Sequence, residues 1–185
     1  MHSRTAVFLD LFGTLLEDHG ILDRLKEIKF KPGVWHAIKQ LEQAHYLVFL
    51  SACRAGVPLP DPKYQQALRA HVCAVLAEHG IPPASIHFIV PPGQPGDAIQ
   101  PLAPEVITAA ARAHHLDLRH SAIVGDLMCD VQIGHQLGMR TVLICSPDDA
   151  PGFEDQDWCE PHHVVATLLE AVECLRNPRH ATQHG

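Results

Sequence analysis

Acidic residues close two apolar segments of this sequence, and their spacing suits a divalent cation. Asp10 ends the first segment, and Asp126 follows residues 121–125, with Asp130 four positions later. Because four residues make about one helical turn, Asp126 and Asp130 can face the same cleft if a helix or tight turn begins between them. Carboxylates gathered at one edge repel each other unless a cation lies among them, and hard oxygen ligands favour Mg²⁺. The alternative is that these acids cap helix starts, which is a common role of Asp.

The elements that must position these acids are predicted from hydrophobic patterning. Short, continuous apolar runs are typical of strands buried on both faces, and they lie at residues 5–11, 46–51, 86–90, 121–125 and 140–145. Segments with helical spacing follow them, at residues 34–41, 64–76, 104–115, 130–137 and about 164–176. The alternation predicts an α/β, Rossmann-like fold, in which a parallel sheet of about five strands carries helices on both faces. Sites in such folds open at the carboxyl ends of the strands, where the acids lie.

Length and composition favour one domain. The chain has 185 residues, of which 46% are hydrophobic, so we expect a single domain over residues 1–185 with its core in residues 5–145. Residues 148–160 carry six acids and no Lys or Arg. We interpret them as a solvated loop that leads to the last helix, at about residues 164–176, with an acidic binding face as the alternative.

Composition also argues against several kinds of partner. The 14 Lys and Arg residues against 21 Asp and Glu residues leave no excess positive charge for a nucleic-acid backbone. No apolar run approaches the ~20 residues that span a bilayer, and the first residues do not have the pattern of a signal peptide. We therefore expect a cytoplasmic protein that binds neither nucleic acid nor membranes.

Two segments resemble motifs of the haloacid dehalogenase (HAD) superfamily. Residues 10–14, which read Asp-Leu-Phe-Gly-Thr, resemble the first motif, and residues 125–138, which carry Asp126 and Asp130, closely resemble the fourth. Ser51 lies where the superfamily places the Ser or Thr of its second motif. The resemblance covers roughly residues 5–145. It is strongest to the branch without a large cap domain that contains histidinol-phosphate and heptose-bisphosphate phosphatases.

The resemblance implies phosphoryl transfer in two steps. In the family, the Asp that matches Asp10 attacks phosphorus to give an aspartyl phosphate, which water then cleaves. The Mg²⁺ ion would be held by Asp10, by the backbone carbonyl of Phe12, and by Asp126 directly or Asp130 through water. Ser51 would donate a hydrogen bond to a phosphate oxygen. The implied substrate is a small phosphorylated metabolite, such as a sugar phosphate or an amino-alcohol phosphate.

The sequence departs from the family pattern at the general acid. The family's second Asp, two residues after the nucleophile, protonates the leaving group, and this chain has Phe12 there. A phenyl ring cannot exchange a proton, so assistance worth about 10²–10⁴-fold is missing unless another group supplies it. Superfamily members that cleave carbon–halogen bonds also lack this acid and typically carry an aromatic residue. Phe12 therefore does not by itself indicate an inactive site.

A second departure is the missing Lys of the third motif. The matching stretch, residues 99–105, has no basic residue, and no Lys follows Lys63. Arg54, three residues beyond Ser51, is the nearest candidate substitute, with an exposed loop Arg as the alternative. We assign Ser51, Ala52 and Arg54 to substrate binding, although Ala52 stands where phosphatases of this branch commonly have a polar residue.

The expected cofactor is Mg²⁺ and not zinc. Related phosphatases often carry a zinc loop of Cys and His just before the third motif. Residues 90–97 contain neither residue type. Because structural zinc needs about four such ligands, no structural zinc is expected there.

Three functions stay open on the sequence. The first is a Mg²⁺-dependent phosphatase with an aspartate nucleophile, weakened by the missing acid and the missing Lys. The second is a catalytically inactive HAD-like protein that binds a ligand or serves as a subunit of an assembly. The third is a dehalogenase-like hydrolase, which fits Phe12 but lacks the Lys that this chemistry also requires. With no large cap, a protein partner or a second copy of the chain could cover the cleft.

Overall fold

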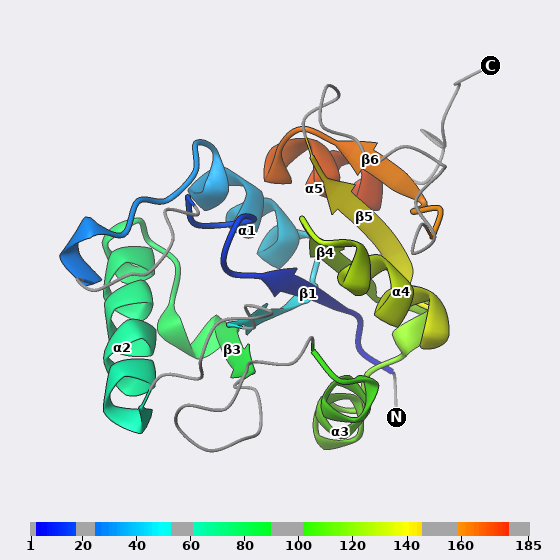
Figure 1. Cartoon of the computed structure of the whole chain (residues 1–185), viewed down its shortest axis with the longest axis horizontal. Helices are drawn as coiled ribbons and strands as arrows, with labels where there is room; N and C mark the ends of the chain where they lie inside the picture. The colour runs from blue at the N-terminus through cyan, green and yellow to red at the C-terminus, as the bar shows by residue number, and fades with distance from the viewer. Residues whose placement is uncertain (1–2, 18–24, 53–60, 90–101, 146–158, 178–185) are drawn as a thin grey trace.

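A parallel sheet between two layers of helices forms the frame of the protein. The structure, a computed structural model, describes residues 3–17, 25–52, 61–89, 102–145 and 159–177 (Figure 1). The sheet has six strands in the order β3-β2-β1-β4-β5-β6, and all neighbours are parallel. The strands are β1 (Ala6–Asp10), β2 (Leu47–Ser51), β3 (Ile86–Ile89), β4 (Ala122–Gly125), β5 (Arg140–Ile144) and β6 (His163–Val165).

Four of the five helices in the described residues lie between consecutive strands of the chain, and the fifth follows β6. The helices are α1 (Val34–Gln43), α2 (Pro62–Glu78), α3 (Pro104–His114), α4 (Met128–Gln136) and α5 (Leu168–Arg176), with short 3₁₀ turns η1 (Leu25–Glu27), η2 (Pro83–Ser85) and η3 (Leu118–His120). The predicted α/β fold with helices on both faces of a parallel sheet is therefore confirmed. None of the helices in the described residues is long and apolar enough to cross a membrane.

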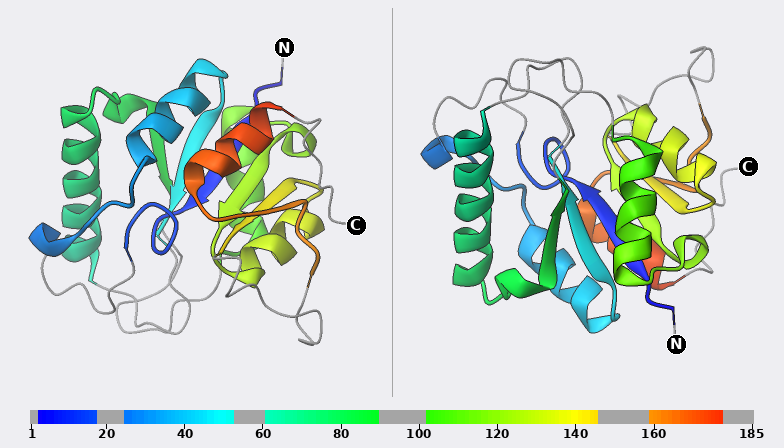
Figure 2. Two further views of the ribbon diagram at one scale, coloured as in Figure 1. Left: turned by 90° about the horizontal axis from the view of Figure 1, so that it is seen from above. Right: turned by 90° about the horizontal axis from the view of Figure 1, so that it is seen from below.

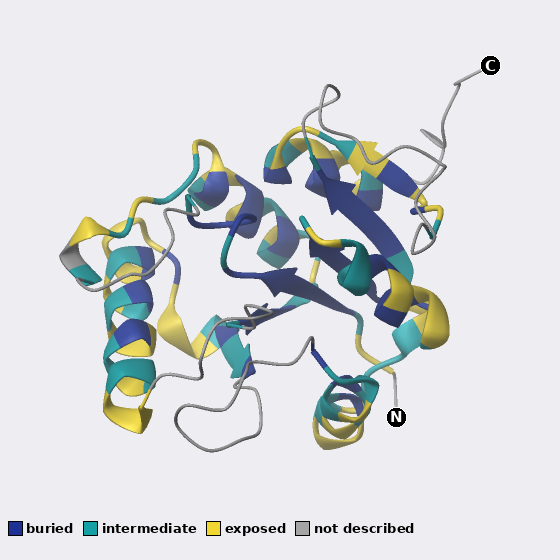
Figure 3. Ribbon diagram, viewed as in Figure 1, coloured by how far each residue is buried: buried dark blue, intermediate teal, exposed yellow. Residues whose placement is uncertain are grey.

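Alternation along the strands divides the core into two layers. Val7 and Leu9 of β1 pack with α1, α2 and α5, whereas Ala6 and Phe8 pack with α3 and α4. Successive strand residues point to opposite faces, so a continuous apolar run fills both layers at once. Figures 2 and 3 show the covered sheet and its buried strands.

The C-terminal segment differs from the predicted helix over residues 164–176. Residues 163–165 form β6, and α5 begins only at Leu168. Thr167 is the N-cap of α5: its side chain accepts a hydrogen bond from the Glu170 N–H, 3.2 Å away. The sheet consequently has six strands, where about five were expected. A strand of three residues is too short for periodicity to separate it from a following helix.

The apolar core also extends beyond the predicted residues 5–145. Leu168, Ala171, Val172 and Leu175 of α5 are buried in the same cluster as β1 and α1. Helix α5 therefore completes one layer of the core.

The order of the strands creates the point at which a site can open. The chain builds β1, β2 and β3 in one direction, then crosses to β4 on the other side of β1. Crevices in open α/β sheets lie beyond the carboxyl ends of the strands at this reversal. Asp10 ends β1, and Asp126 directly follows β4. The two acids therefore flank the reversal.

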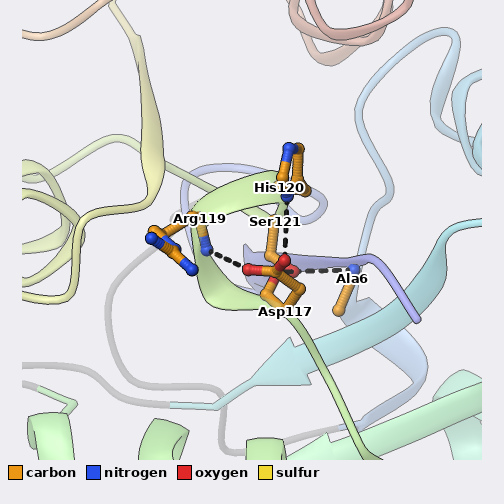
Figure 4. A network of polar contacts seen from close by, with 5 residues as sticks. All are labelled: Ala6, Asp117, Arg119, His120 and Ser121. Atoms are coloured by element: carbon orange, nitrogen blue, oxygen red, sulfur yellow. Dashed lines mark hydrogen bonds and ion pairs between the residues drawn. The ribbon is translucent and has the colours of Figure 1, made fainter. Parts of the chain in front are cut away.

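A polar network fixes the opposite, amino-terminal end of β1. The Ala6 N–H donates to the buried Ser121 Oγ over 3.0 Å, and Ser121 Oγ donates to the Asp117 carbonyl over 2.6 Å (Figure 4). The Asp117 carboxylate accepts from the Arg119 N–H at 3.0 Å and contacts His120 Nδ1 at 2.9 Å. These contacts couple the turn η3, which precedes β4, to the first residue of β1.

We expect the substitution Ser121→Ala to lower the free energy of unfolding by about 1–3 kcal/mol, because it leaves the buried Ala6 N–H without its acceptor. The measurement is urea unfolding followed by circular dichroism. Ser51→Ala is the matched control: Ser51 is also buried, but its hydroxyl has no hydrogen-bond partner among the described residues, so its removal should cost little. Equal losses in the two variants would contradict this assignment.

Candidate active site

Two of the predicted site residues end neighbouring strands and lie opposite each other. Asp10 pairs in register with Ser51, and both side chains are buried, with exposed fractions of 6% and 4%. The Leu11 N–H donates to the Ser51 carbonyl over 2.9 Å, which ties the segment after β1 to the end of β2. A carboxylate and a hydroxyl are thus brought together at the carboxyl edge of the sheet. A buried carboxylate is costly unless partners stabilise it.

The segment after Asp10 is a tight, hydrogen-bonded turn. The Leu15 and Leu16 N–H groups both donate to the Leu11 carbonyl, over 3.1 and 2.9 Å, and the Gly13 N–H donates to the Leu16 carbonyl over 3.0 Å. Gly13 has a φ of 77°, in the left-handed region that glycine adopts without strain. Thr14 in this turn is buried, and its hydroxyl has no hydrogen-bond partner within the described residues. Thr14 is a site residue that sequence reasoning did not assign.

The Asp126 and Asp130 carboxylates each pack closely against a glycine. The Asp126 carboxylate lies so near Gly13 that a Cβ there would overlap it, and the Asp130 carboxylate lies equally close to Gly125. Asp126 therefore joins the end of β4 to the turn after β1. Asp130 lies in the first turn of α4 and points back toward the end of β4. The structure thus places these two acids at the edge where Asp10 ends β1.

Electrostatic effects show that the three acids share one region. Burial, followed by the negative charge of Asp126, raises the pKa of Asp130 to about 7. Burial, followed by the charges of Asp130 and Asp10, raises the pKa of the Cys129 thiol to about 12. Cys129 is therefore a protonated thiol between the two acids and is not a nucleophile at neutral pH. The Asp130 Oδ2 atom is buried without a hydrogen-bond partner in the described part of the chain.

The donor set fits Mg²⁺, although it is not a closed cage of side chains. Within the described residues, no three His, Cys, Asp or Glu side chains converge closely enough to hold a metal ion by themselves. The expected set of Asp10, the Phe12 carbonyl, and Asp126 directly or Asp130 through water uses fewer protein side chains, as Mg²⁺ sites generally do. A buried, unsatisfied carboxylate oxygen with a raised pKa is the signature of a site that lacks a positive charge. These ligand assignments stay predictions.

The remaining predicted residues contribute less to the described geometry. Arg54 lies outside the described residues, as do residues 90–97 and the first part of the 99–105 stretch. The Ala52 N–H donates to the Ile89 carbonyl over 3.4 Å, and its methyl group packs against the core. The substrate contacts of Ala52 and Arg54 therefore stay predictions. The Phe12 ring packs against the core, and the role of its backbone carbonyl as a metal ligand stays a prediction.

A basic side chain that sequence reasoning missed lies beside the turn. Lys31 Nζ donates a hydrogen bond to the carbonyl of Gly13, the residue against which Asp126 packs. The contact depends on pairing between Leu16 and Phe30, which brings the segment before α1 next to the turn after β1. No local sequence pattern predicts a single antiparallel bridge of this kind.

Comparisons with known proteins agree with this arrangement. A family model described as HAD-hydrolase-like matches residues 102–171. The D-glycero-D-manno-heptose-1,7-bisphosphate 7-phosphatase of Thermosynechococcus vestitus is 27% identical, and the match covers 93% of this chain and 95% of that protein.

Solved structures show the same fold. The D,D-heptose 1,7-bisphosphate phosphatase of B. bronchiseptica, complexed with magnesium and phosphate, has a TM-score of 0.75 at 24% identity, covering 93% of this chain and 98% of that one. The corresponding enzyme of Burkholderia thailandensis has a TM-score of 0.70 at 20% identity, covering 94% and 99%. The resemblance to the HAD superfamily and to its heptose-bisphosphate phosphatase branch is confirmed, and so is the HAD-type fold.

We expect Gly13→Ala to destabilise the protein more than Gly33→Ala, by about 1–3 kcal/mol. Both glycines have left-handed backbones, with φ of 77° and 80°, so both variants carry the same conformational strain. Only at Gly13 would the new methyl group also overlap a carboxylate, because a methyl group on Gly33 would come no closer than 3.9 Å to the side chain of Leu169. Urea unfolding measures the difference, and equal losses would show that Asp126 can move aside freely.

We expect the melting temperature of metal-free protein to fall, relative to that of Asp130→Asn, as the pH rises from 4 to 8. The folded-state pKa of Asp130 is raised to about 7, so the folded protein holds this proton more tightly than the unfolded chain does. The resulting stabilisation is complete below about pH 4 and is lost as the pH rises through about 7. The neutral Asn does not titrate. Scanning calorimetry in EDTA measures this, and a pH-independent difference between the two proteins would refute it.

Proposed function

We propose that this chain is a Mg²⁺-dependent phosphatase with Asp10 as its nucleophile, acting on a small phosphorylated sugar. The observation that carries the proposal is the juxtaposition of the buried Asp10 with Ser51 and with the Asp126 carboxylate seated on Gly13. The heptose-bisphosphate phosphatases that this chain resembles support the substrate class. The whole site is assembled from residues of the chain's own sheet edge.

In the first step, an Asp10 carboxylate oxygen attacks phosphorus and the bond to the leaving oxygen breaks. The β1 backbone and the Leu11 contact to Ser51 hold Asp10 in place, so little orientational freedom is lost on reaction. The Ser51 hydroxyl, which is buried and has no hydrogen-bond partner among the described residues, would donate to a phosphate oxygen. Mg²⁺ on Asp10, Asp126 and the Phe12 carbonyl, with Asp130 through water, would neutralise charge between the anionic nucleophile and the anionic phosphate.

In the second step, water attacks phosphorus, inorganic phosphate leaves and the Asp10 carboxylate is regenerated.

Phe12 cannot supply a proton to the oxygen that leaves in the first step, so solvent water must do so. The rate should therefore depend steeply on the leaving group. Acyl phosphates and aryl phosphates, whose leaving groups need no proton, should react about 10²–10⁴-fold faster than alkyl monoesters.

A non-catalytic binding protein is the second candidate, because Phe12 stands at the position of the general acid and its half-buried ring packs against the core. The same edge of the sheet would then bind a phosphorylated ligand without turning it over. A dehalogenase-like hydrolase has no specific observation of this structure in its favour.

We expect Asp10→Asn to abolish the Mg²⁺-dependent hydrolysis of acetyl phosphate and p-nitrophenyl phosphate, because the amide is not a nucleophile. Release of inorganic phosphate measures the activity, and EDTA should remove it reversibly. Asp61→Asn is the matched control, since Asp61 is an exposed helix cap and Asn caps equally well. Activity that survives Asp10→Asn would reject the mechanism. Mg²⁺-dependent phosphate binding without any turnover would favour the binding protein.

A further inference from the structure

Lys31 is held beside the nucleophile turn by its backbone. Its N–H donates to the Leu15 carbonyl over 2.8 Å, and two residues earlier the Lys29 carbonyl accepts from the Glu17 N–H over 2.9 Å. Leu16 and Phe30 form an antiparallel bridge between these two contacts. The position of Lys31 next to the turn is therefore fixed by backbone hydrogen bonds and does not depend on its flexible side chain.

The Lys31 side chain turns back onto the residue that seats Asp126. Its Nζ donates to the Gly13 carbonyl, while the Asp126 carboxylate packs against Gly13 from its Cα side. An ammonium group has three donors, of which this contact uses one. No carboxylate of the described residues forms an ion pair with Lys31. Its charge is therefore available to the acids of the site.

The described part of the site otherwise carries an excess of negative charge. Asp10, Asp126 and Asp130 lie at one edge of the sheet. Asp130 is half-buried, and its buried Oδ2 atom has no hydrogen-bond partner among the described residues. A phosphate brought to this edge adds two further negative charges at neutral pH. Coulomb energies at a partly buried site fall off only slowly with distance, so one nearby positive charge can change the affinity for an anion about tenfold or more. One partly buried ammonium group is thus large enough to decide whether an anion binds.

We propose that Lys31 is the positioning residue of this site, holding the Gly13 turn in place and supplying the positive charge that allows an anionic phosphate to approach Asp10. The inference rests on the proposed function, because it assumes that phosphate binds at Asp10. It assigns a role to the segment before α1. Lys31 acts through Gly13 and through its charge, without touching the reacting atoms.

The test compares Lys31→Met, which keeps the length of the side chain and removes its charge, with Lys31→Arg, which keeps the charge. Lys29→Met is the matched control, since Lys29 is exposed in the same segment. Isothermal titration calorimetry measures the binding of Mg²⁺ alone, and then of inorganic phosphate at saturating Mg²⁺. Thermal unfolding of the same samples reports on folding.

We expect Lys31→Met to move the two affinities in opposite directions. Removing a positive charge should strengthen Mg²⁺ binding several-fold and weaken phosphate binding about tenfold or more. Lys31→Arg should restore most of the phosphate affinity, and Lys29→Met should change neither value. A purely structural role for Lys31 would weaken both affinities together, so that result would overturn the proposal, as would unchanged phosphate binding.

The binding test is independent of turnover. If the wild-type protein hydrolyses none of the esters but Lys31→Met shifts the Mg²⁺ and phosphate affinities in opposite directions, the role of Lys31 is supported and the proposed function is rejected. If the wild-type protein hydrolyses phosphate esters but Lys31→Met binds Mg²⁺ and phosphate with wild-type affinity, the proposed function is supported and the role of Lys31 is rejected. Failure of the wild-type protein to bind either Mg²⁺ or phosphate overturns both.

Discussion

The repulsion among carboxylates at one sheet edge is the constraint on which this structure depends. Parallel strands end together, so the topology that buries β1 and β4 also brings their terminal acids into one region. Glycines then let the carboxylates approach the backbone, because Gly13 and Gly125 have no Cβ to exclude Asp126 and Asp130. The fold accepts an electrostatic cost at this edge, where burial and then the charge of Asp126 raise the pKa of Asp130 to about 7. Shifted pKa values of this kind are typical of functional sites, and a nearby cation would lower the cost.

In the proposed site, the positive charge comes from Lys31. The stretch that resembles the third motif of the superfamily contains no basic residue, and the first turn of α3 contains Glu105. Lys31 contacts the turn after β1 from the segment before α1. A charge acts through space, so its effect on an anion depends on distance and burial more than on the element that carries it. Equivalent chemistry can therefore arise from a different place in the chain.

Much of the fold could be predicted from the sequence, because strands buried on both faces leave continuous apolar runs. Asp10 and Asp126 could be placed at strand ends for the same reason. The strand β6 could not be predicted, because it has only three residues, with the exposed Val164 in the middle, and shows no recognisable hydrophobic periodicity. Lys31 could not be predicted either, because its contact with the Gly13 carbonyl joins positions that lie 18 residues apart in the chain. The sequence predicts which residues bind the metal. It does not predict their coordination geometry, because the spacing of residues in the chain does not determine side-chain orientation.

The hydrogen bond between the Ala6 N–H and Ser121 Oγ also affects the carboxyl end of β1. Side chains alternate along β1, so sliding the strand by one position would present an aliphatic residue where the Asp10 carboxylate now stands. Ser121 anchors the beginning of β1, and the Leu11 contact with Ser51 anchors its end. The Asp10 carboxylate is thus kept in register by the Ser121 hydroxyl at the other end of β1, so loss of that hydroxyl would misalign Asp10 without removing its carboxylate.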